Sequence, residues 1–308
     1  MIVLRIMNKR EEKKQSSGRL LIIAAALLWG LAGVCVKSIS WGPMPIVAVR
    51  SVISLTMLFA VKRSFRLKIT KTNLLGALMM SATSILYVVA IKLTTAGTAI
   101  VLQYTAPVLV FLFAVLFQHR KAKTAEIILT LAVFAGCLIS FLDSLDFTRL
   151  LGNLLAFASA FTFAGQIIVM NRTDCDTEDT TILSNSLCFL ICLPFVFTET
   201  LVWDAKNIIW LLIMAVFQYG LANIVFSRGI QRIDPVEASV LLSIEPIFNP
   251  IPVAIFCGEK MSALAILGSA IVIVSVTLHG LLPKWEAKKQ AVGRKAVLGE
   301  DGKKERPV

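Results

Sequence analysis

One carboxylate, Glu245, lies near the middle of an apolar stretch, residues 238–260 (ASVLLSIEPIFNPIPVAIFCGEK). The stretch is long enough to cross a lipid bilayer, which takes roughly 20 mostly apolar residues. A charge at the bilayer centre costs about 2.5–3.5 kcal/mol on insertion scales, so an ionisable residue there usually has a function. Such a carboxylate can exchange a proton or hold an amine. The alternative is that Glu245 stays neutral and only packs beside a bend.

Prolines interrupt the same stretch at Pro246, Pro250 and Pro252. Proline lacks a backbone N–H and breaks the hydrogen-bond ladder of a helix. We therefore expect the second part of this span to be bent or irregular and to gate one mouth of a cavity. Pro107 occupies the corresponding position in an earlier span and is expected to act in the same way.

Two cations lie inside other apolar stretches, Lys37 and Arg50. Lys37 is close to the end of its span and could extend its ammonium to the membrane surface. Arg50 is deeper, keeps its charge and can grip a carboxylate with two parallel hydrogen bonds. It could form a structural ion pair with Glu245. Alternatively, the pair could open to receive an amphoteric substrate, with the carboxylate on Arg50 or Lys37 and the amine on Glu245.

Polar residues of neighbouring spans could add hydrogen bonds to the same cavity, although polar residues in membrane helices often bond only to another helix. Gln103 and Tyr104 stand out because they directly precede Pro107. The full set of expected substrate-binding or coupling residues is Lys37, Arg50, Tyr87, Gln103, Tyr104, Gln166, Asn223 and Glu245.

The composition places these residues in a membrane protein. The 308-residue chain is 57% hydrophobic and 16% charged, with a mean hydropathy of +0.80, more apolar surface than a soluble core of this size could hide. We expect an all-α protein with ten membrane spans, at about residues 20–39, 44–62, 73–91, 97–117, 124–142, 151–170, 180–198, 206–227, 235–256 and 262–282.

The basic residues predict the orientation. With both tails (1–19 and 283–308) in the cytoplasm, the cytoplasmic segments hold 25 Lys and Arg residues and the outer connections hold 4. This asymmetry is the positive-inside pattern of a plasma or inner membrane protein. The net charge of +12 therefore reflects topology, and we expect no nucleic-acid partner. The N-terminal tail is expected to be disordered or to lie on the membrane surface.

An internal repeat divides the chain into two five-span halves, residues 20–142 and 150–282. A shift of 139 residues aligns 90–142 with 229–281 and pairs Pro107 with Pro246. Because five is odd, the second half would enter the membrane from the opposite side. Inverted repeats of this kind place a substrate site near the midplane, where the halves meet.

Other chemistry has little support. The chain has no G-x-x-x-x-G-K-[ST] loop, no Ser/His/Asp or paired-carboxylate pattern, two histidines and no C-x-x-C pair. We therefore expect no enzyme activity, metal or cofactor. The acidic segment 171–180 (NRTDCDTEDT) is interpreted as a solvated loop.

The segment EPIFNP followed by CGEK (245–260), with Trp29, Gly30 and Lys37 and with Pro45 and Arg50, resembles the EamA-type transporters of the drug/metabolite transporter superfamily. The resemblance covers about residues 20–282. It implies a ten-helix inverted-repeat carrier that commonly exports amino acids or related metabolites. In one departure, the first half has His119-Arg120 where the second has Gly258-Glu259, so the acidic end of that motif occurs once.

The sequence therefore favours a secondary carrier that exports a small polar metabolite through the lipid bilayer, with amino acids as the leading class and a proton as a possible coupling ion. The alternatives are a proton-coupled exporter of cationic drugs, in which Glu245 holds the cargo and Arg50 is structural, and a membrane sensor or partner subunit that transports nothing.

Overall fold

The computed structural model describes residues 2–117, 124–143, 147–233, 235–242, 244–258, 262–264, 266–275 and 277–278. Within them the chain is helical and contains no β-strand. The expected C-terminal tail, 283–308, and the His119-Arg120 and Glu259 positions lie outside the described residues.

The elements are α1 (Ile2–Trp29), α2 (Ala32–Ser38), α3 (Pro43–Lys62), α4 (Lys71–Leu93), α5 (Ala96–Gln103), α6 (Ala106–Phe117), α7 (Thr124–Asp143), α8 (Phe147–Met170), α9 (Thr177–Thr198), α10 (Ala205–Ile213), the π-helix η1 (Met214–Leu221), α11 (Ala222–Ile230), α12 (Pro235–Leu242), α13 (Ile244–Phe248) and α14 (Pro250–Cys257).

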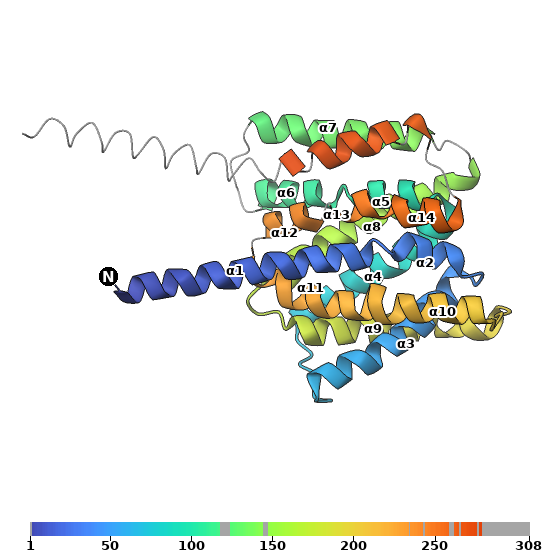
Figure 1. Cartoon of the computed structure of the whole chain (residues 1–308), viewed down its shortest axis with the longest axis horizontal. Coiled ribbons are helices and arrows are strands. Elements are labelled where there is room, and N and C mark those ends of the chain that lie inside the picture. The colour runs from blue at the N-terminus through green and yellow to red at the C-terminus, as the bar shows by residue number, and fades with distance from the viewer. Residues whose placement is uncertain are drawn as a thin grey trace, which may run out of the picture.

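The helices run roughly side by side, and their connections gather at two ends (Figure 1). The connections 63–70, 171–176 and 231–233 lie at the end from which the first part of α1 projects, which we call the tail end. The connections 39–42, 94–95 and 199–204 lie at the opposite end, which we call the far end. Local signals start several helices: the side chains of Thr70, Thr95, Asp176 and Asp204 each accept a hydrogen bond from a backbone N–H in the first turn.

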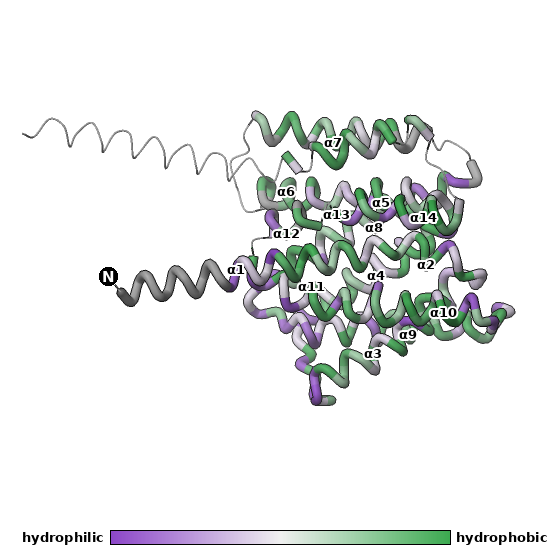
Figure 2. The backbone as a smooth tube through the Cα atoms, viewed as in Figure 1, coloured by the Kyte–Doolittle hydropathy of each residue, from purple (hydrophilic) through white to green (hydrophobic). Residues whose placement is uncertain are grey.

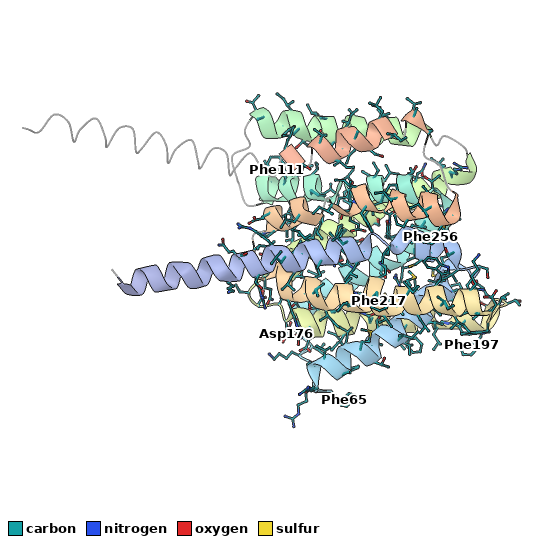
Figure 3. The ribbon with its side chains drawn as sticks, in the orientation of Figure 1. Phe65, Phe111, Asp176, Phe197, Phe217 and Phe256 are labelled. Carbon is teal, nitrogen blue, oxygen red and sulfur yellow. The ribbon has the colours of Figure 1, made fainter. Side chains whose placement is uncertain are left out.

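Hydrophobic residues dominate the lengths of the helices (Figure 2). Large hydrophobic side chains are exposed on many helices, including Phe197, Phe217 and Phe256, which Figure 3 labels. Many polar side chains, among them Arg50 and Glu245, are buried instead. An apolar exterior around a partly polar interior suits a protein whose solvent is lipid.

Seven helical segments among the described residues are long and apolar enough to cross a membrane: 14–38, 43–62, 71–93, 96–113, 149–170, 177–198 and 205–230. Shorter apolar helices lie at Ile127–Gly136, Ile244–Cys257 and Ile266–Ser275, inside the expected fifth, ninth and tenth spans. The chain is thus an all-α protein of the membrane type, and the count of ten spans stays a prediction.

The main helix contacts join the two halves. Helix α4 packs against α8 and α9, α3 packs against α9, and α1 packs against α11. In the two halves, α1 corresponds to α8, α3 to α9 and α4 to α11. A two-fold rotation that exchanges the halves would therefore convert the α4–α8 contact into the α11–α1 contact and would map the α3–α9 contact onto itself. These contacts are therefore the set that two halves related by a two-fold axis would make, and the halves meet along the centre of the bundle.

The N-terminal segment is helical. Residues 2–19, expected to be disordered or to lie on the membrane surface, form the first part of α1, which projects beyond the bundle (Figure 1). A helix is at odds with disorder, and the surface-lying alternative stays a prediction. The segment KREEKKQ is made of residues with high helix propensity, and the helix it extends is already nucleated by packing in the bundle.

Candidate functional site

A cavity lies between the two halves of the chain. Its volume is about 70 Å³. One water needs about 10–15 Å³, so the space holds several waters or a small solute. The lining residues are Trp29, Ala32, Arg50, Met80, Thr83, Ser84, Tyr87, Val88 and Gln103 from the first half, and Phe163, Gln166, Gln218, Tyr219, Asn223 and Glu245 from the second.

Arg50 supplies the positive charge of this cavity. Its side chain is 2% exposed, one guanidinium nitrogen donates to the Ser84 hydroxyl, and the guanidinium carbon lies 4.0 Å from the centre of the Tyr219 ring. Stacking over an aromatic ring stabilises a cation by about 0.5–2 kcal/mol. The Nε atom of Arg50 is buried and has no hydrogen-bond partner. This cation is therefore held in place from two sides while part of its donor set stays unused.

Glu245 supplies the carboxyl group, on the short helix α13, and is 4% exposed. The hydroxyl of Tyr104 lies 2.8 Å from Glu245 Oε2 and 2.6 Å from the carbonyl oxygen of Leu242. In a regular helix that carbonyl would accept from the N–H of residue 246, which is proline and has none. The break caused by Pro246 thus leaves an acceptor that Tyr104, from the broken span of the other half, satisfies.

The expected ion pair between Arg50 and Glu245 does not form in this structure. No ion pair joins the two side chains, both of which are described, although both line the cavity. The reason is that each is held by a different neighbour: Tyr104 binds the carboxyl group, while Ser84 and Tyr219 hold the guanidinium group. The interpretation of Arg50 and Glu245 as a structural pair that locks the halves together is therefore wrong for this conformation.

Several other buried polar atoms around the cavity also lack hydrogen-bond partners. They are the hydroxyls of Tyr87 and Tyr219, Oε1 of Gln218, and both amide atoms of Asn223. A buried polar atom without a partner costs about 1–3 kcal/mol, so native proteins satisfy nearly all of them with protein, water or ligand. A cluster of such atoms around one cavity, together with the free Nε of Arg50, indicates a polar occupant that offers both donors and acceptors.

A π-helix brings part of this cluster together. Gln218 and Asn223 are five residues apart, which at about 100° per residue places them about 140° apart on a regular α-helix. Both nevertheless line the cavity, because η1 (Met214–Leu221) has the wider i→i+5 turn of a π-helix, an element frequent at functional sites. The turn packs tightly on α3: a side chain at Gly220 would come within 2.9 Å of Met57 Sδ.

The structure places the remaining expected site residues as follows. Gln103 and Gln166 line the cavity, and the Gln103 amide donates to the Ser159 hydroxyl at 3.2 Å. Tyr104 lies behind the lining, where it contacts two of the lining residues, Glu245 and Phe163. Lys37 lies outside it, because its ammonium donates to the carbonyl of Thr94 at 2.8 Å, near the far end.

The four prolines lie where helices restart. Pro107 follows the break between α5 and α6, Pro246 is inside α13, and Pro250 and Pro252 begin α14. The expectation of an irregular span is therefore met by three short helices, α12, α13 and α14, in place of one continuous helix. Whether these breaks move as a gate is a separate matter and stays a prediction.

Sequence reasoning missed several lining residues, namely Thr83, Ser84, Gln218, Tyr219 and Phe163. Gln218 and Tyr219 carried one usable signal, a polar pair in the centre of the apolar span 206–227. The hydroxyls of Thr83 and Ser84 carried none, because such residues occur in most membrane helices without a ligand. Among the described residues, no group of three or more His, Cys, Asp or Glu side chains is placed to hold a metal ion.

Comparison with known proteins agrees with this architecture. The chain is similar, at a TM-score of 0.67 and 19% sequence identity, to a protein of known crystal structure, and the match covers 87% of this chain and 98% of that one. At this identity the likeness shows the fold alone. No curated protein matches the chain. The model of the EamA-like transporter family matches twice, over residues 16–142 and 150–281, which confirms the resemblance carried by the Glu245-Pro246 segment. The chain belongs to the EamA-like transporter family.

Proposed function

We propose that this protein is a secondary carrier that exports a small polar metabolite, an amino acid or a related compound, by alternating access. The observation that carries the proposal is the polar cavity between the halves, with a buried cation, a buried carboxyl group and unpartnered hydrogen-bonding atoms inside an apolar bundle. A cavity at the junction of two repeats is where rocking of one half against the other exposes a cargo alternately to each side.

The geometry suits a zwitterionic cargo. Arg50 has a free donor and no carboxylate partner in this conformation, so a cargo carboxylate can take that place. The Gln218 carbonyl, the Asn223 amide and the Tyr87 hydroxyl supply acceptors and donors for the rest of the molecule. Trp29 and Phe163, whose ring centres are 6.2 Å apart, form an apolar wall for a side chain.

A count of hydrogens supports a proton as the coupling ion. The Tyr104 hydroxyl has one hydrogen but lies within hydrogen-bond distance of two acceptors, Leu242 O and Glu245 Oε2. Both contacts become full hydrogen bonds if Tyr104 donates to Leu242 and a protonated Glu245 donates to Tyr104. If Glu245 lost that proton, its buried carboxylate and the Leu242 carbonyl would compete for the one hydrogen of Tyr104. This cost favours a conformation in which the cavity is open to water.

Flux measurements on purified protein in proteoliposomes test the proposal. We expect saturable counterflow of at least one radiolabelled amino acid from a panel, and uptake that responds to an imposed pH gradient. Flux of lipophilic cations alone would replace the metabolite carrier by a drug exporter. No flux of any compound would favour the sensor or partner role.

The positive-inside pattern gives a testable topology. We propose that the tail end is cytoplasmic, as are both termini, and that the protein lies in the plasma (inner) membrane. In a cysteine-free protein, Ile69→Cys at the tail end should be shielded from an impermeant thiol reagent added to intact cells, and Thr200→Cys at the far end should react. Both positions are exposed, so access depends on the side of the membrane. The reverse labelling would place both termini outside.

A further inference from the structure

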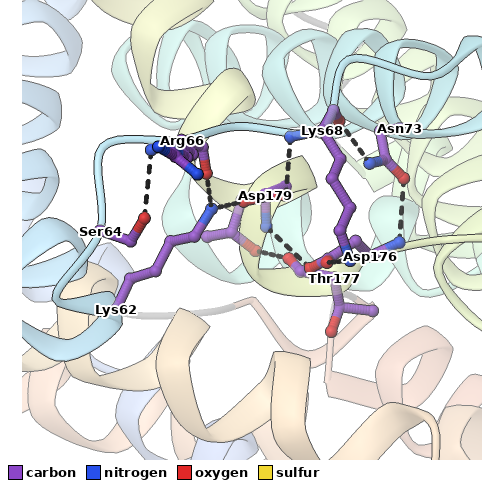
Figure 4. A network of polar contacts seen from close by, with 9 residues as sticks. Lys62, Ser64, Arg66, Lys68, Asn73, Asp176, Thr177 and Asp179 are labelled. Atoms are coloured by element: carbon purple, nitrogen blue, oxygen red, sulfur yellow. Dashed lines mark hydrogen bonds and ion pairs between the residues drawn. The ribbon is translucent and has the colours of Figure 1, made fainter.

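The acidic segment 171–180, expected to be a solvated loop, is a folded junction at the tail end. Asp176 caps helix α9, and Asp179, one turn later, is 1% exposed. The Asp179 carboxylate forms an ion pair with the ammonium of Lys62, the last residue of α3, and accepts from the backbone N–H of Lys68 at 2.9 Å (Figure 4). A buried carboxylate of the second half is thus held entirely by residues of the first.

A second set of contacts surrounds this pair (Figure 4). The Lys68 ammonium lies 3.3 Å from Asp176 Oδ2, and the Asp176 N–H donates to the Asn73 side chain at 2.9 Å. Asn73 in turn donates to the Lys68 carbonyl at 2.7 Å. We call Lys62, Lys68, Asn73, Asp176 and Asp179 the tail-end lock. Its first three members belong to the first half of the chain and its last two to the second.

Next to the tail-end lock, the helices are closely packed on the way to the cavity. A side chain at Gly76 would come within 2.8 Å of Thr180 Cγ2, so α4 and α9 are in direct contact there. One turn further along α4, the Ser81 hydroxyl donates to the Ser184 carbonyl at 3.1 Å. Ser84, on the next turn, lines the cavity. The path between α4 and α9 from the tail end to the cavity is therefore closed.

The two halves meet differently at the far end. There the Ser40 N–H donates to the Asn207 side chain at 2.9 Å, and the Trp41 indole donates to the Val202 carbonyl at 2.8 Å. These bonds join neutral groups, whereas Lys62 with Asp179 and Lys68 with Asp176 join opposite charges. Ion pairs therefore join the two halves at the tail end.

We infer that the tail-end lock is the ionic gate of the cytoplasmic mouth, and that Lys62 must leave Asp179 for cargo to enter the cavity from the cytoplasm. A buried ion pair has two favourable states, paired in the protein or separated with both ions in water, and a costly intermediate in which one ion is buried alone. Such an element switches between a closed and an open state. The inference rests on the proposed carrier function.

A neighbouring carboxylate, Asp174, adds a further contact between the halves at this end. Hydrogen bonds from Arg172 and Thr72 lower the pKa of Asp174 to about 2, so it stays ionised at physiological pH. Thr72 belongs to the first half, so its 2.7 Å bond to Asp174 also bridges the halves.

Cys175 gives a direct readout of the gate. It lies between Asp174 and Asp176, is 4% exposed, and burial raises the pKa of its thiol, so it should react slowly while the tail-end lock is closed. In a protein whose only cysteine is Cys175, in inside-out vesicles, Asp179→Asn and Lys62→Gln should each raise alkylation by an impermeant maleimide about tenfold or more. The double variant should react no faster than either single variant, since both remove the same interaction.

Arg228→Gln is the matched control. It breaks the 3.5 Å Arg228–Glu178 pair, which lies at the same end but within the second half, and should leave the alkylation rate unchanged. Parent-like alkylation in Asp179→Asn and Lys62→Gln would overturn the inference. An equal increase in the alkylation rate of Arg228→Gln would also overturn the inference, because the tail end would then have loosened in general and not through loss of the Lys62–Asp179 pair.

A crosslink tests the same gate by replacing the ion pair with a covalent link that can be opened by reduction. In a cysteine-free protein, Lys62→Cys with Asp179→Cys, joined by a short thiol crosslinker, should lose flux and regain it on reduction. Arg228→Cys with Glu178→Cys, crosslinked within one half, should keep flux. Undiminished flux across the closed Lys62–Asp179 link would overturn the gate. Absence of flux in the cysteine-free parent protein would instead contradict the carrier function, while Cys175 alkylation would still report on the tail-end lock.

Discussion

Glu245→Gln is expected to abolish the response of transport to a pH gradient while leaving the protein folded. Glutamine has nearly the same shape and can still bond to Tyr104, but it cannot gain or lose a proton. The contacts around Glu245 are to a hydroxyl and not to a cation, so no buried charge is left without its partner. Because glutamine cannot carry the coupling proton, gradient-driven uptake should fall to the rate measured without a gradient, while equilibrium exchange of cargo persists.

The control is Glu237→Gln, the same substitution in the same span. Glu237 lies on α12 and pairs with Arg19 at 2.8 Å at the tail end, outside the cavity lining. It should keep the pH response. Uptake and exchange would be measured in proteoliposomes over a range of pH, with protein level checked by size-exclusion chromatography in detergent. If Glu245→Gln showed the parent rate and pH profile, the carboxyl group would have no part in proton coupling and would only pack beside the break in the helix.

Arg50→Gln is expected to weaken cargo binding strongly and to cost little stability. A lost charge-assisted contact of about 1.5–3 kcal/mol corresponds to about a 10- to 100-fold rise in the KM for a carboxylate-bearing cargo. The sequence left open a structural ion pair between Arg50 and Glu245, and removing Arg50 from such a pair would leave Glu245 buried without its partner. Because no ion pair joins them in this structure, the empty carrier should unfold at nearly the parent temperature.

Two variants sharpen this prediction. Arg50→Lys keeps the charge but loses the planar fork, so its KM should lie between those of the parent and Arg50→Gln. Lys37→Met removes the other cation of the apolar spans, which donates to Thr94 outside the cavity, and should leave the KM unchanged. The measurements are the concentration dependence of counterflow and thermal unfolding in detergent. An unchanged KM in Arg50→Gln, or a large fall in its unfolding temperature, would contradict the assigned role.

The membrane class and most helices followed from the sequence, because length and hydropathy decide what can cross a bilayer whatever the tertiary contacts. The family resemblance rested on Glu245-Pro246 and its surroundings, and the two matches of the family model confirmed it. For residues 2–19 the sequence left both disorder and a surface-lying segment open, and helix propensity with an adjoining packed helix continued α1 there.

The cavity itself was decided by tertiary structure. Gln218 and Asn223 share its wall only because η1 widens the turn between them, and π-helical turns leave no clear sequence pattern. Arg50 and Glu245 were recognised from charge and depth, but their partners could not be, since Ser84 and Tyr104 reach them from other helices. Asp179 looked like one more charge in a polar loop until the fold brought Lys62 to it. The sequence alone shows that a polar group in an apolar span would be costly to bury. Which partner offsets that cost depends on how helices far apart in the sequence pack together.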